Sequence, residues 1–332
     1  MKKFITSVFA VFTLLVLVAC NGAKKEFAVD GEFTAFEVTE HTSQGVKVPQ
    51  ITAVTVTVKN GKITKYYIDV RQGSVVRDAE EQITAVAWNT KTKKELGADY
   101  GMAGVGPKYK FEGGEWSVVP DAKCEKEWHE QAALIEAKWL ADGVESVTTT
   151  DSRIDNVAGV TLKDGGYTKL AKEAVANAKA GKFVVYKTGL SYSGAAEVYS
   201  ATLTVEKGKA KALVIDTRQS KVNATTGLAW NAKTKQELGA EYAMKGVGPK
   251  YEFQDGAWVV VEGKCELEWN EQAELIQNYV LKNYNKNLKA VAGRGGSLDG
   301  TTLIDDFAGV TVNTGTYFEL IHAVYKLAGL DK

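Results

Sequence analysis

The chain repeats itself once, at a spacing of about 150 residues. Residues 87–109 read AWNTKTKKELGADYGMAGVGPKY, and residues 229–251 read AWNAKTKQELGAEYAMKGVGPKY. The blocks IDVRQ and KCEKEWHEQAALI, which begin at Ile68 and Lys123, return in the same order as IDTRQ and KCELEWNEQAELI. This period is too long for a solenoid and suits two tandem domains. The sequence therefore predicts one fold made twice.

The N-terminus has the features of a bacterial lipoprotein signal. Two lysines precede an apolar run over residues 4–19, which is short for a membrane span and suitable for a signal-peptide core. The run ends in Leu-Val-Ala-Cys, which resembles the lipobox, in which the cysteine, here Cys20, is diacylated and becomes the mature N-terminus. A plain signal peptide or a short buried helix is the alternative. We expect cleavage of residues 1–19 and a lipidated tether over residues 20–30, on the outer face of the cell membrane.

Composition is consistent with two folded units. The 332 residues are 45% hydrophobic and 25% charged, so two cores can be buried and disorder over most of the chain is excluded. The chain carries 41 basic and 41 acidic residues. Removal of Lys2 and Lys3 with the leader leaves 39 basic residues against 41 acidic ones, a formal charge of −2. Nothing in this balance attracts nucleic acid.

Each half predicts strands first and helices afterwards. Alternating apolar residues over 53–58 and 62–70 flank Asn60-Gly61, which is typical of a hairpin turn. Residues 201–205 and 210–216 repeat this pattern around Lys207-Gly208. We therefore expect an α+β fold in each half, in which helices pack on an antiparallel sheet. The expected domains are residues 31–180 and 181–332, with the boundary near Gly181.

The helices are predicted from apolar residues that recur every three or four positions. One helix in each half has such a stripe: Trp128, Ala132, Ile135 and Trp139, and then Trp269, Ala273, Ile276 and Val280. A last helix follows in each half, with the stripes Leu170, Ala174, Val175 and Ala178, and Leu320, Val324 and Leu327.

A seven-residue motif precedes each of these last helices. It reads DNVAGVT over residues 155–161 and DDFAGVT over residues 305–311. Gly159 and Gly309 permit a tight backbone turn and open access to the hydroxyl group two positions later. We expect the motif to lead directly into the helix, whose N-terminus would favour a phosphate group.

The polar residues of the motif allow two interpretations. Thr161 and Thr311 could hold a phosphate, while Asp155 and Asp305 accept a hydrogen bond in the loop or help to hold a metal ion beside it. Alternatively, each aspartate only forms the turn and each threonine only caps the helix. The identical spacing in both halves favours the functional interpretation.

The motifs and their surroundings resemble the FMN-binding domain family. In that family the threonine of an Asp-x-x-Ser-Gly-Ala-Thr-like motif is joined to FMN through a phosphodiester, as in the flavin-carrying components of the sodium-pumping NADH:quinone oxidoreductase and of the Rnf complex. Residues 94–102 (KELGADYGM) and 236–244 (QELGAEYAM) also look like that family. The paired, lipid-anchored arrangement is similar to the PplA-type flavin lipoproteins of Gram-positive extracellular electron transfer. The resemblance covers nearly all of the mature chain.

This resemblance implies two covalent FMN groups, one on Thr161 and one on Thr311, attached by a flavin transferase of the ApbE type. The signal that this transferase reads would include the remaining motif residues Asp155, Gly159, Asp305 and Gly309. Ala158 and Ala308 stand where the family often has serine or threonine, and Val160 and Val310 stand where it often has alanine. Both motifs depart identically, so they represent a variant of the pattern.

The resemblance further implies an electron carrier rather than a turnover enzyme. It would accept electrons from a membrane NADH dehydrogenase or the quinone pool and pass them to extracellular acceptors such as ferric iron. Covalent attachment suits this location, because reversibly bound flavin would be lost by dilution outside the cell. A flavin ring needs an apolar or aromatic surface. The candidates for that surface, which core packing explains equally well, are Tyr100, Met102, Tyr242 and Met244.

Two other functions fit the sequence. One is a surface lipoprotein without flavin that binds a solute or a cell-wall component in a cleft between the halves. The other is a duplicated adhesion module. Cys124 and Cys265 occupy matching positions, as either a disulfide or two free buried thiols. The Gly-Val-Gly-Pro segments at 104–107 and 246–249 lack nucleotide-loop spacing and predict turns beside the flavin pocket. The scattered histidines predict surface positions and no metal site: His41, His129 and His322.

Overall fold

The computed structural model describes residues 26–43, 45–255, 257–286, 288, 310–312 and 315–331. Within them the chain has a mixed α+β fold. The expected leader, the lipidated Cys20, Asp305 and Gly309 lie outside the described residues.

The first half begins with strands, and most of its helices follow them. Its long strands are β1 (Gly31–Ser43), β2 (Val46–Lys59) and β3 (Lys62–Arg77). After them come β4 (Ile83–Trp88), helix α1 (Lys93–Leu96), the 3-10 turn η1 (Gly97–Tyr100), the hairpin β5 (Pro107–Glu112) and β6 (Glu115–Lys123), helix α2 (Trp128–Asp142), η2 (Val144–Ser146), β7 (Thr149–Thr150), β8 (Arg153–Ile154) and helix α3 (Tyr167–Lys179).

The second half repeats this order of elements, and among the described residues it has no counterparts of η2, β7 and β8. Its strands and helices are β9 (Lys182–Leu190), β10 (Ala196–Glu206), β11 (Lys209–Asn223), β12 (Gly227–Trp230), α4 (Lys235–Leu238), η3 (Gly239–Tyr242), β13 (Pro249–Gln254), β14 (Ala257–Lys264), α5 (Trp269–Asn283) and α6 (Gly315–Leu327). The first set of elements ends at Lys179 and the second begins at Lys182, where one sequence repeat gives way to the next.

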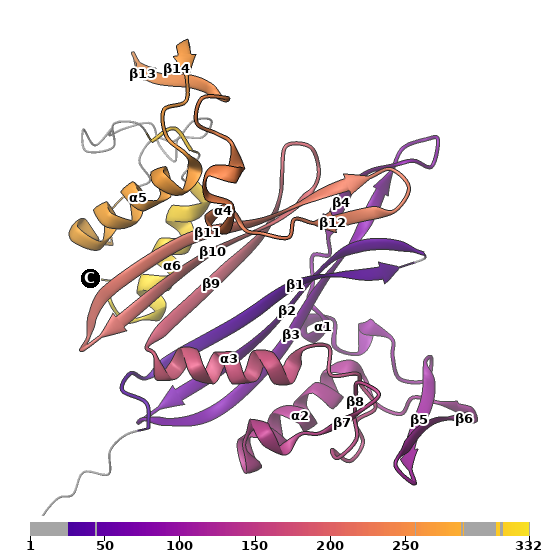
Figure 1. Cartoon of the computed structure of the whole chain (residues 1–332). Helices are drawn as coiled ribbons and strands as arrows, with labels where there is room; N and C mark the ends of the chain where they lie inside the picture. Colours follow the sequence, from indigo (N-terminus) through magenta and orange to yellow (C-terminus); the bar gives the residue numbers. More distant parts are fainter. Residues whose placement is uncertain are drawn as a thin grey trace, which may run out of the picture.

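The long strands of both halves belong to one eight-stranded sheet. Its order is β4-β3-β2-β12-β11-β10-β9, and β1 pairs with β2 off this path. The halves join where Gly227 of β12 lies beside Lys47 of β2 in a parallel bridge. Each half covers its own strands with its own helices, α2 and α3 in one case and α5 and α6 in the other (Figure 1).

Both predicted hairpins are confirmed. β2 pairs with β3, and β10 pairs with β11, in antiparallel register. Asn60 and Gly61 have φ angles of 53° and 71°, and Lys207 and Gly208 have φ angles of 50° and 73°. Two successive positive φ angles are those of the type I′ turn, whose twist matches that of the flanking strands. The Asp30 carboxylate accepts the N–H groups of Asn60 and Gly61 at 2.6 and 2.8 Å.

The predicted helix faces are confirmed in α2 and α5, and the last helices α3 and α6 bury their predicted stripes except for Val175 and Leu327, which are half-buried. Helix α2 buries the four predicted stripe residues together with Gln131, and α5 buries its four together with Gln272. The hydrophobic core that they enter runs through both halves. Phe33 on β1 and Phe183 on β9 lie at its centre, with ring centroids 4.5 Å apart. The two halves are therefore packed against each other through equivalent strands.

A second contact between the halves is reciprocal. The Trp88 indole N–H of β4 donates to the carbonyl oxygen of Gly189 on β9, at 3.0 Å. The Trp230 indole N–H of β12 donates to the carbonyl oxygen of Thr39 on β1, at 2.8 Å. The two indole rings lie 6.3 Å apart between centroids. Each half thus places one tryptophan on the first strand of the other.

Candidate functional site

The first motif forms a turn between β8 and α3 that its aspartate holds in place. The Asp155 carboxylate accepts the hydroxyl groups of Thr148 and Thr150, the second at 2.7 Å. The neighbouring Asn156 accepts the Thr148 N–H at 3.1 Å and donates to the Ser146 carbonyl at 2.7 Å. Asp155 thus has the hydrogen-bonding role that was predicted for it within the loop. The described residues contain no group of three His, Cys, Asp or Glu side chains placed to hold a metal ion.

Gly159 is required by the shape of this turn. Its φ angle is +79°, and a Cβ atom there would lie 2.9 Å from Cε of Lys126. The next residue, Val160, is 3% exposed and anchors the turn in the core. A side chain at position 159 would strain the backbone and push Lys126 away from the loop.

The prediction that the motif threonine begins a helix is wrong for Thr161. Helix α3 begins at Tyr167, six residues after Thr161. The described part of α6 begins at Gly315, after Thr311. The cause in the first half is a local pairing, in which the Ile154 N–H donates to the Leu162 carbonyl at 3.0 Å. This pairing keeps the chain after Thr161 extended. The N-terminus of α3 therefore does not lie at the threonine.

A buried glutamine holds each threonine instead. The Gln131 side-chain oxygen accepts the backbone N–H of Thr161 at 2.7 Å and its hydroxyl at 3.3 Å. Gln272 accepts the same two groups of Thr311 at 2.7 and 3.5 Å. The Gln131 amide also donates to the Lys126 carbonyl at 3.1 Å. Sequence reasoning missed both glutamines, although a polar residue recurring on an otherwise apolar helix face was a usable signal.

Sulfur atoms surround the other end of each glutamine. In the first half the glutamine amide nitrogen lies 3.5 Å from Cys124 Sγ and 3.9 Å from Met102 Sδ. In the second half the corresponding distances to Cys265 Sγ and Met244 Sδ are 3.6 and 3.7 Å. Both cysteines are buried and free. Of the two alternatives for the cysteines, the structure has free thiols, one in each site.

A glutamate brings the methionine segment to each site. Glu127, at the start of α2, accepts the N–H groups of Met102 and Ala103 at 2.9 and 3.0 Å. Glu268 accepts the N–H of Met244 at 2.9 Å. The predicted Gly-Val-Gly-Pro turns complete this connection, since the N–H of Gly104 donates to the Cys124 carbonyl at 2.8 Å.

Thr161 lines a pocket of about 290 Å³ with aromatic walls. Phe111 and Trp116 form one wall, with ring centroids 5.3 Å apart. The indole N–H of Trp116 is buried and has no hydrogen-bond partner among the described residues. Tyr109 forms another wall, and the Arg153 guanidinium lies 3.6 Å from its ring centroid. Arg153 also donates to the Thr161 carbonyl at 2.5 Å.

Thr311 lines a corresponding pocket of about 350 Å³. Tyr242, Met244 and Tyr251 contribute to its walls, together with Pro249 of the predicted turn. Two of the four residues predicted to face a flavin ring therefore lie at this threonine. In the first half, the Met102 sulfur contacts the amide nitrogen of Gln131, whose oxygen binds Thr161. Tyr100 is partly buried and packs against the hydrophobic core.

A lysine covers the aromatic residues behind each site. Lys93 Nζ lies 4.8 Å from the Tyr100 ring centroid and 5.5 Å from that of Trp128. Lys235 repeats these contacts in the second half, at 5.1 and 5.5 Å from Tyr242 and Trp269. Burial lowers the pKa of Lys93 to about 8, because desolvation disfavours its charged form.

The histidines are only partly where they were expected. His41 is exposed, and its pKa is lowered by partial burial and by the charge of Lys93. His129 and His322 are half-buried, so the expected surface position is met only in part. His322 lies 3.1 Å from the Tyr284 hydroxyl and 2.6 Å from the Leu288 carbonyl oxygen, so it is part of the packing of the second half.

The geometry fits a phosphate ester that carries a planar group. The only bond that each threonine hydroxyl makes within the described residues is the long one to its glutamine, so esterification would leave the shorter N–H bond intact. Around the first threonine, Lys126 and Arg153 could balance a phosphodiester charge, while Lys108 is paired with Glu125. The aromatic walls and the unpartnered indole N–H suit a flat ring with carbonyl groups.

Comparison with known proteins identifies no relative of this chain: no family model, curated protein or solved structure matches it. Across the part of the chain that the structure describes, every helix is too short or too polar to cross a bilayer. The function is therefore inferred from the residues and geometry of the site.

Proposed function

We propose that this chain is a lipid-anchored electron carrier on the outer face of the cell membrane, with one FMN joined through a phosphodiester to each of Thr161 and Thr311. The observation that carries the proposal is a repeated arrangement. In each half a partly exposed threonine hydroxyl lies at an aromatic pocket, while a buried glutamine fixes the threonine backbone at the same distance of 2.7 Å.

The repeat favours this function over a plain helix cap. A capping threonine would lie next to its helix, and Thr161 does not, because α3 begins at Tyr167. Both threonines instead line a cavity, and the shorter bond to each glutamine uses the backbone N–H and not the hydroxyl group. Gly159 and Thr161 line the same pocket, and a side chain at position 159 would displace Lys126, which also lines it.

The residues of the first pocket would then have separate roles toward FMN. Lys126 and Arg153 would balance the phosphodiester charge, and Trp116 would donate its free indole N–H to a ring carbonyl. Tyr109 and Phe111 would cover the ring and exclude water. When bound, FMN supplies the exchange of one or two electrons, which suits transfer between a two-electron donor and a one-electron acceptor.

The proposal includes a finer description of the fold and partners. The chain would consist of two tandem domains of the FMN-binding type, residues 31–180 and 181–332, behind a lipidated Cys20. Its donor would be a membrane NADH dehydrogenase or the quinone pool, and its acceptors would be extracellular, such as ferric iron. The duplicated order of elements and the duplicated threonine sites support this description.

The test is the intact mass of the mature protein made together with its flavin transferase. We expect a yellow protein that stays yellow after denaturation, with two FMN additions. Thr161→Ala and Thr311→Ala should each remove one addition, and the double variant should be colourless. Thr149→Ala, which replaces an exposed threonine on the nearby strand β7, is the control and should keep both.

Two results would contradict the proposal. One is unmodified Thr161 and Thr311 in protein isolated from its own cell envelope. The other is flavin that remains after both substitutions, which would show attachment elsewhere. With both threonines unmodified, the solute-binding hypothesis takes its place.

A further inference from the structure

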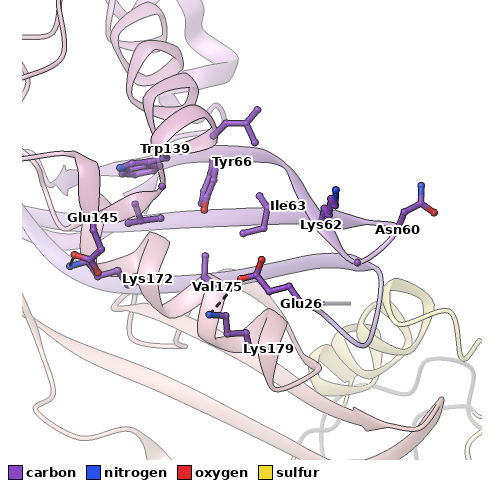
Figure 2. Close-up of a pocket in the computed structure, with 14 residues that line it drawn as sticks. Glu26, Asn60, Lys62, Ile63, Tyr66, Trp139, Glu145, Lys172, Val175 and Lys179 are labelled. Carbon is purple, nitrogen blue, oxygen red and sulfur yellow. Dashed lines mark ion pairs between the residues drawn. The ribbon is translucent and has the colours of Figure 1, made fainter. Parts of the chain in front are cut away.

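A separate pocket of about 890 Å³ lies at the other end of α2 from Gln131. Figure 2 shows it between α2, α3 and the hairpin of β2 and β3. Tyr66 and Trp139 form its floor, with ring centroids 5.6 Å apart and ring planes inclined at 63°. Ile63 and Val175 add apolar sides. This pocket belongs to the first half alone and plays no part in the proposed flavin sites.

The second half shows what can fill such a space. The N–H of Gly143 ends α2 by donating to the Trp139 carbonyl at 2.9 Å, and the N–H of Tyr284 ends α5 by donating to the Val280 carbonyl at 2.8 Å. Tyr284 therefore takes the position of Gly143. On the last helix of each half, Val175 and Tyr325 both lie 14 residues after the motif threonine.

The two tyrosines of the second half form a flat stack. The rings of Tyr284 and Tyr325 lie 3.5 Å apart between centroids, with planes inclined at only 15°. The Tyr284 hydroxyl also donates to the Asp331 carboxylate at 2.8 Å. In the first half, Gly143 and Val175 supply neither ring. The space occupied by a planar aromatic stack in one half is thus left open in the other.

The rim of the open pocket is cationic. Lys62, Lys172 and Lys179 line it, against the two carboxylates of Glu26 and Glu145. Lys172 pairs with Glu145 at 2.7 Å and Lys179 with Glu26 at 3.7 Å, and all four of these side chains are substantially exposed. Such exposed pairs are weak, so a competing anion can displace a carboxylate at small cost.

The floor offers one unused hydrogen-bond donor. Trp139 is 1% exposed, and its indole N–H has no partner among the described residues. A buried donor without a partner costs free energy, and the Trp139 side chain would have to turn toward the pocket for an acceptor on a ligand to relieve that cost. Concave apolar surface with a few polar groups is the usual form of a small-molecule site.

We propose that this pocket binds a planar aromatic or quinoid molecule of one or two fused rings that carries a carboxylate or another anionic group. The ring lies on Tyr66 and Trp139, where the second half packs its own tyrosine stack. The anionic group faces the lysines of the rim. Neither the position of the ring nor that of the anionic group depends on the flavin proposal, because none of these residues lines the pocket of Thr161.

The test is a calorimetric titration of the mature chain with 2-naphthoate. We expect saturable binding to one site. Val175→Tyr places the side chain of the second half in the pocket and should weaken binding roughly tenfold or more, because a filled apolar pocket excludes the ring. Ala176→Tyr is the matched control, since it adds the same side chain to the exposed face of α3, and it should leave the affinity unchanged.

Charge and planarity are tested separately. The neutral analogue 2-naphthamide and the non-planar cyclohexanecarboxylate should each bind more weakly than 2-naphthoate. Lys172→Glu reverses a charge at an exposed position without risk to the core, so it should weaken 2-naphthoate binding even if Val175→Tyr fails to fold. Equal affinity in the wild type and Lys172→Glu would overturn the proposal, as would the absence of binding at millimolar concentration.

The titration is repeated with the Thr161→Ala, Thr311→Ala double variant. Retained binding there shows that the site is independent of the flavin sites, and its loss overturns the assignment to this pocket. The mass measurement of the proposed function is unaffected by either result, so the two proposals fail separately.

Discussion

The two halves of the chain have the same contacts at the N-terminal ends of helices α2 and α5 and different ones at the C-terminal ends. At the first turns of α2 and α5, Gln131 and Gln272 accept a threonine N–H at the same 2.7 Å. At the ends of the helices, the first half has a glycine beside an open pocket and the second half has a stacked tyrosine. The duplicated sequence has kept the geometry around the threonine and allowed the opposite end to change.

A second difference lies between these two ends. The Glu136 carboxylate of α2 accepts the Ile68 N–H at 2.6 Å and pairs with Lys94 at 2.6 Å. In the second half Gln277 accepts the Ile215 N–H at 2.9 Å and receives the Gln236 amide at 3.3 Å. One half therefore joins helix to strand with a largely buried ion pair, and the other uses two neutral amides in the same positions.

The largest expected effects are those of replacing the two glutamines, whose contacts match in the two halves. Gln131→Leu should lower the free energy of unfolding by about 3 kcal/mol, because the Thr161 N–H and the Lys126 carbonyl both lose their partner. Gln272→Leu should cost about the same. Urea unfolding measures both, with Ala137→Leu on the exposed face of α2 as the control. A cost no larger than that of the control would show that the glutamine does not hold the loop.

The ion pair offers a sharper comparison. Glu136→Gln should cost about 2 kcal/mol, because Lys94, whose side chain is only 14% exposed, would be left without a countercharge. Adding Lys94→Gln reproduces the pair of the second half and should recover most of that loss. A double-mutant cycle in urea measures the coupling between the two positions. A double variant as unstable as the single one would mean that the two halves are not interchangeable here.

The reciprocal tryptophans should give equal and smaller effects. Trp88→Phe and Trp230→Phe each remove one indole hydrogen bond to the other half and should each cost about 1 kcal/mol. The control is Trp116→Phe, because the Trp116 N–H has no partner among the described residues. Thermal unfolding of the three variants measures this. Clearly unequal costs for Trp88 and Trp230 would break the twofold comparison.

The smallest effect concerns pH. The pKa of Lys93 is lowered from 10.5 to about 8 in the folded chain, so above pH 8 the unfolded chain holds a proton that the folded chain has released. Linkage then makes the protein more stable as pH rises. Between pH 7 and 8.5 the wild type should gain less than about 1 kcal/mol relative to Lys93→Met. Thermal midpoints of both proteins across this range measure the gain, and a flat difference would contradict it.

Local sequence patterns predicted the fold's elements well. Asn60-Gly61 fixes a type I′ turn through its own φ angles, and the apolar stripe from Trp128 to Trp139 fixes the buried face of α2. The sharing of one sheet between the halves was not predictable, because it depends on a single bridge between residues distant in sequence. Gly227, where a Cβ atom would meet the Lys47 carbonyl, has a φ angle of +84° and gives no local sign of its partner.

The candidate site was predicted in part for similar reasons. The motif around Gly159 and Val160 correctly indicated a turn. The pairing of Ile154 with Leu162 separates Thr161 from α3, and such a pairing leaves no periodic pattern. Gln131 was missed because glutamine in a helix usually faces water, and only the folded chain shows that its amide bridges α2 and the loop.

The exchange of tryptophans between the halves limits how the molecule can move. A hinge between the halves would have to break both indole bonds and slide Phe33 past Phe183 in a packed interior. The pockets of Thr161 and Thr311 therefore belong to one rigid body, so their separation and orientation stay constant. If the proposed flavins are present, the distance between them cannot be changed by bending between the halves, and their approach to a partner requires movement of the whole protein.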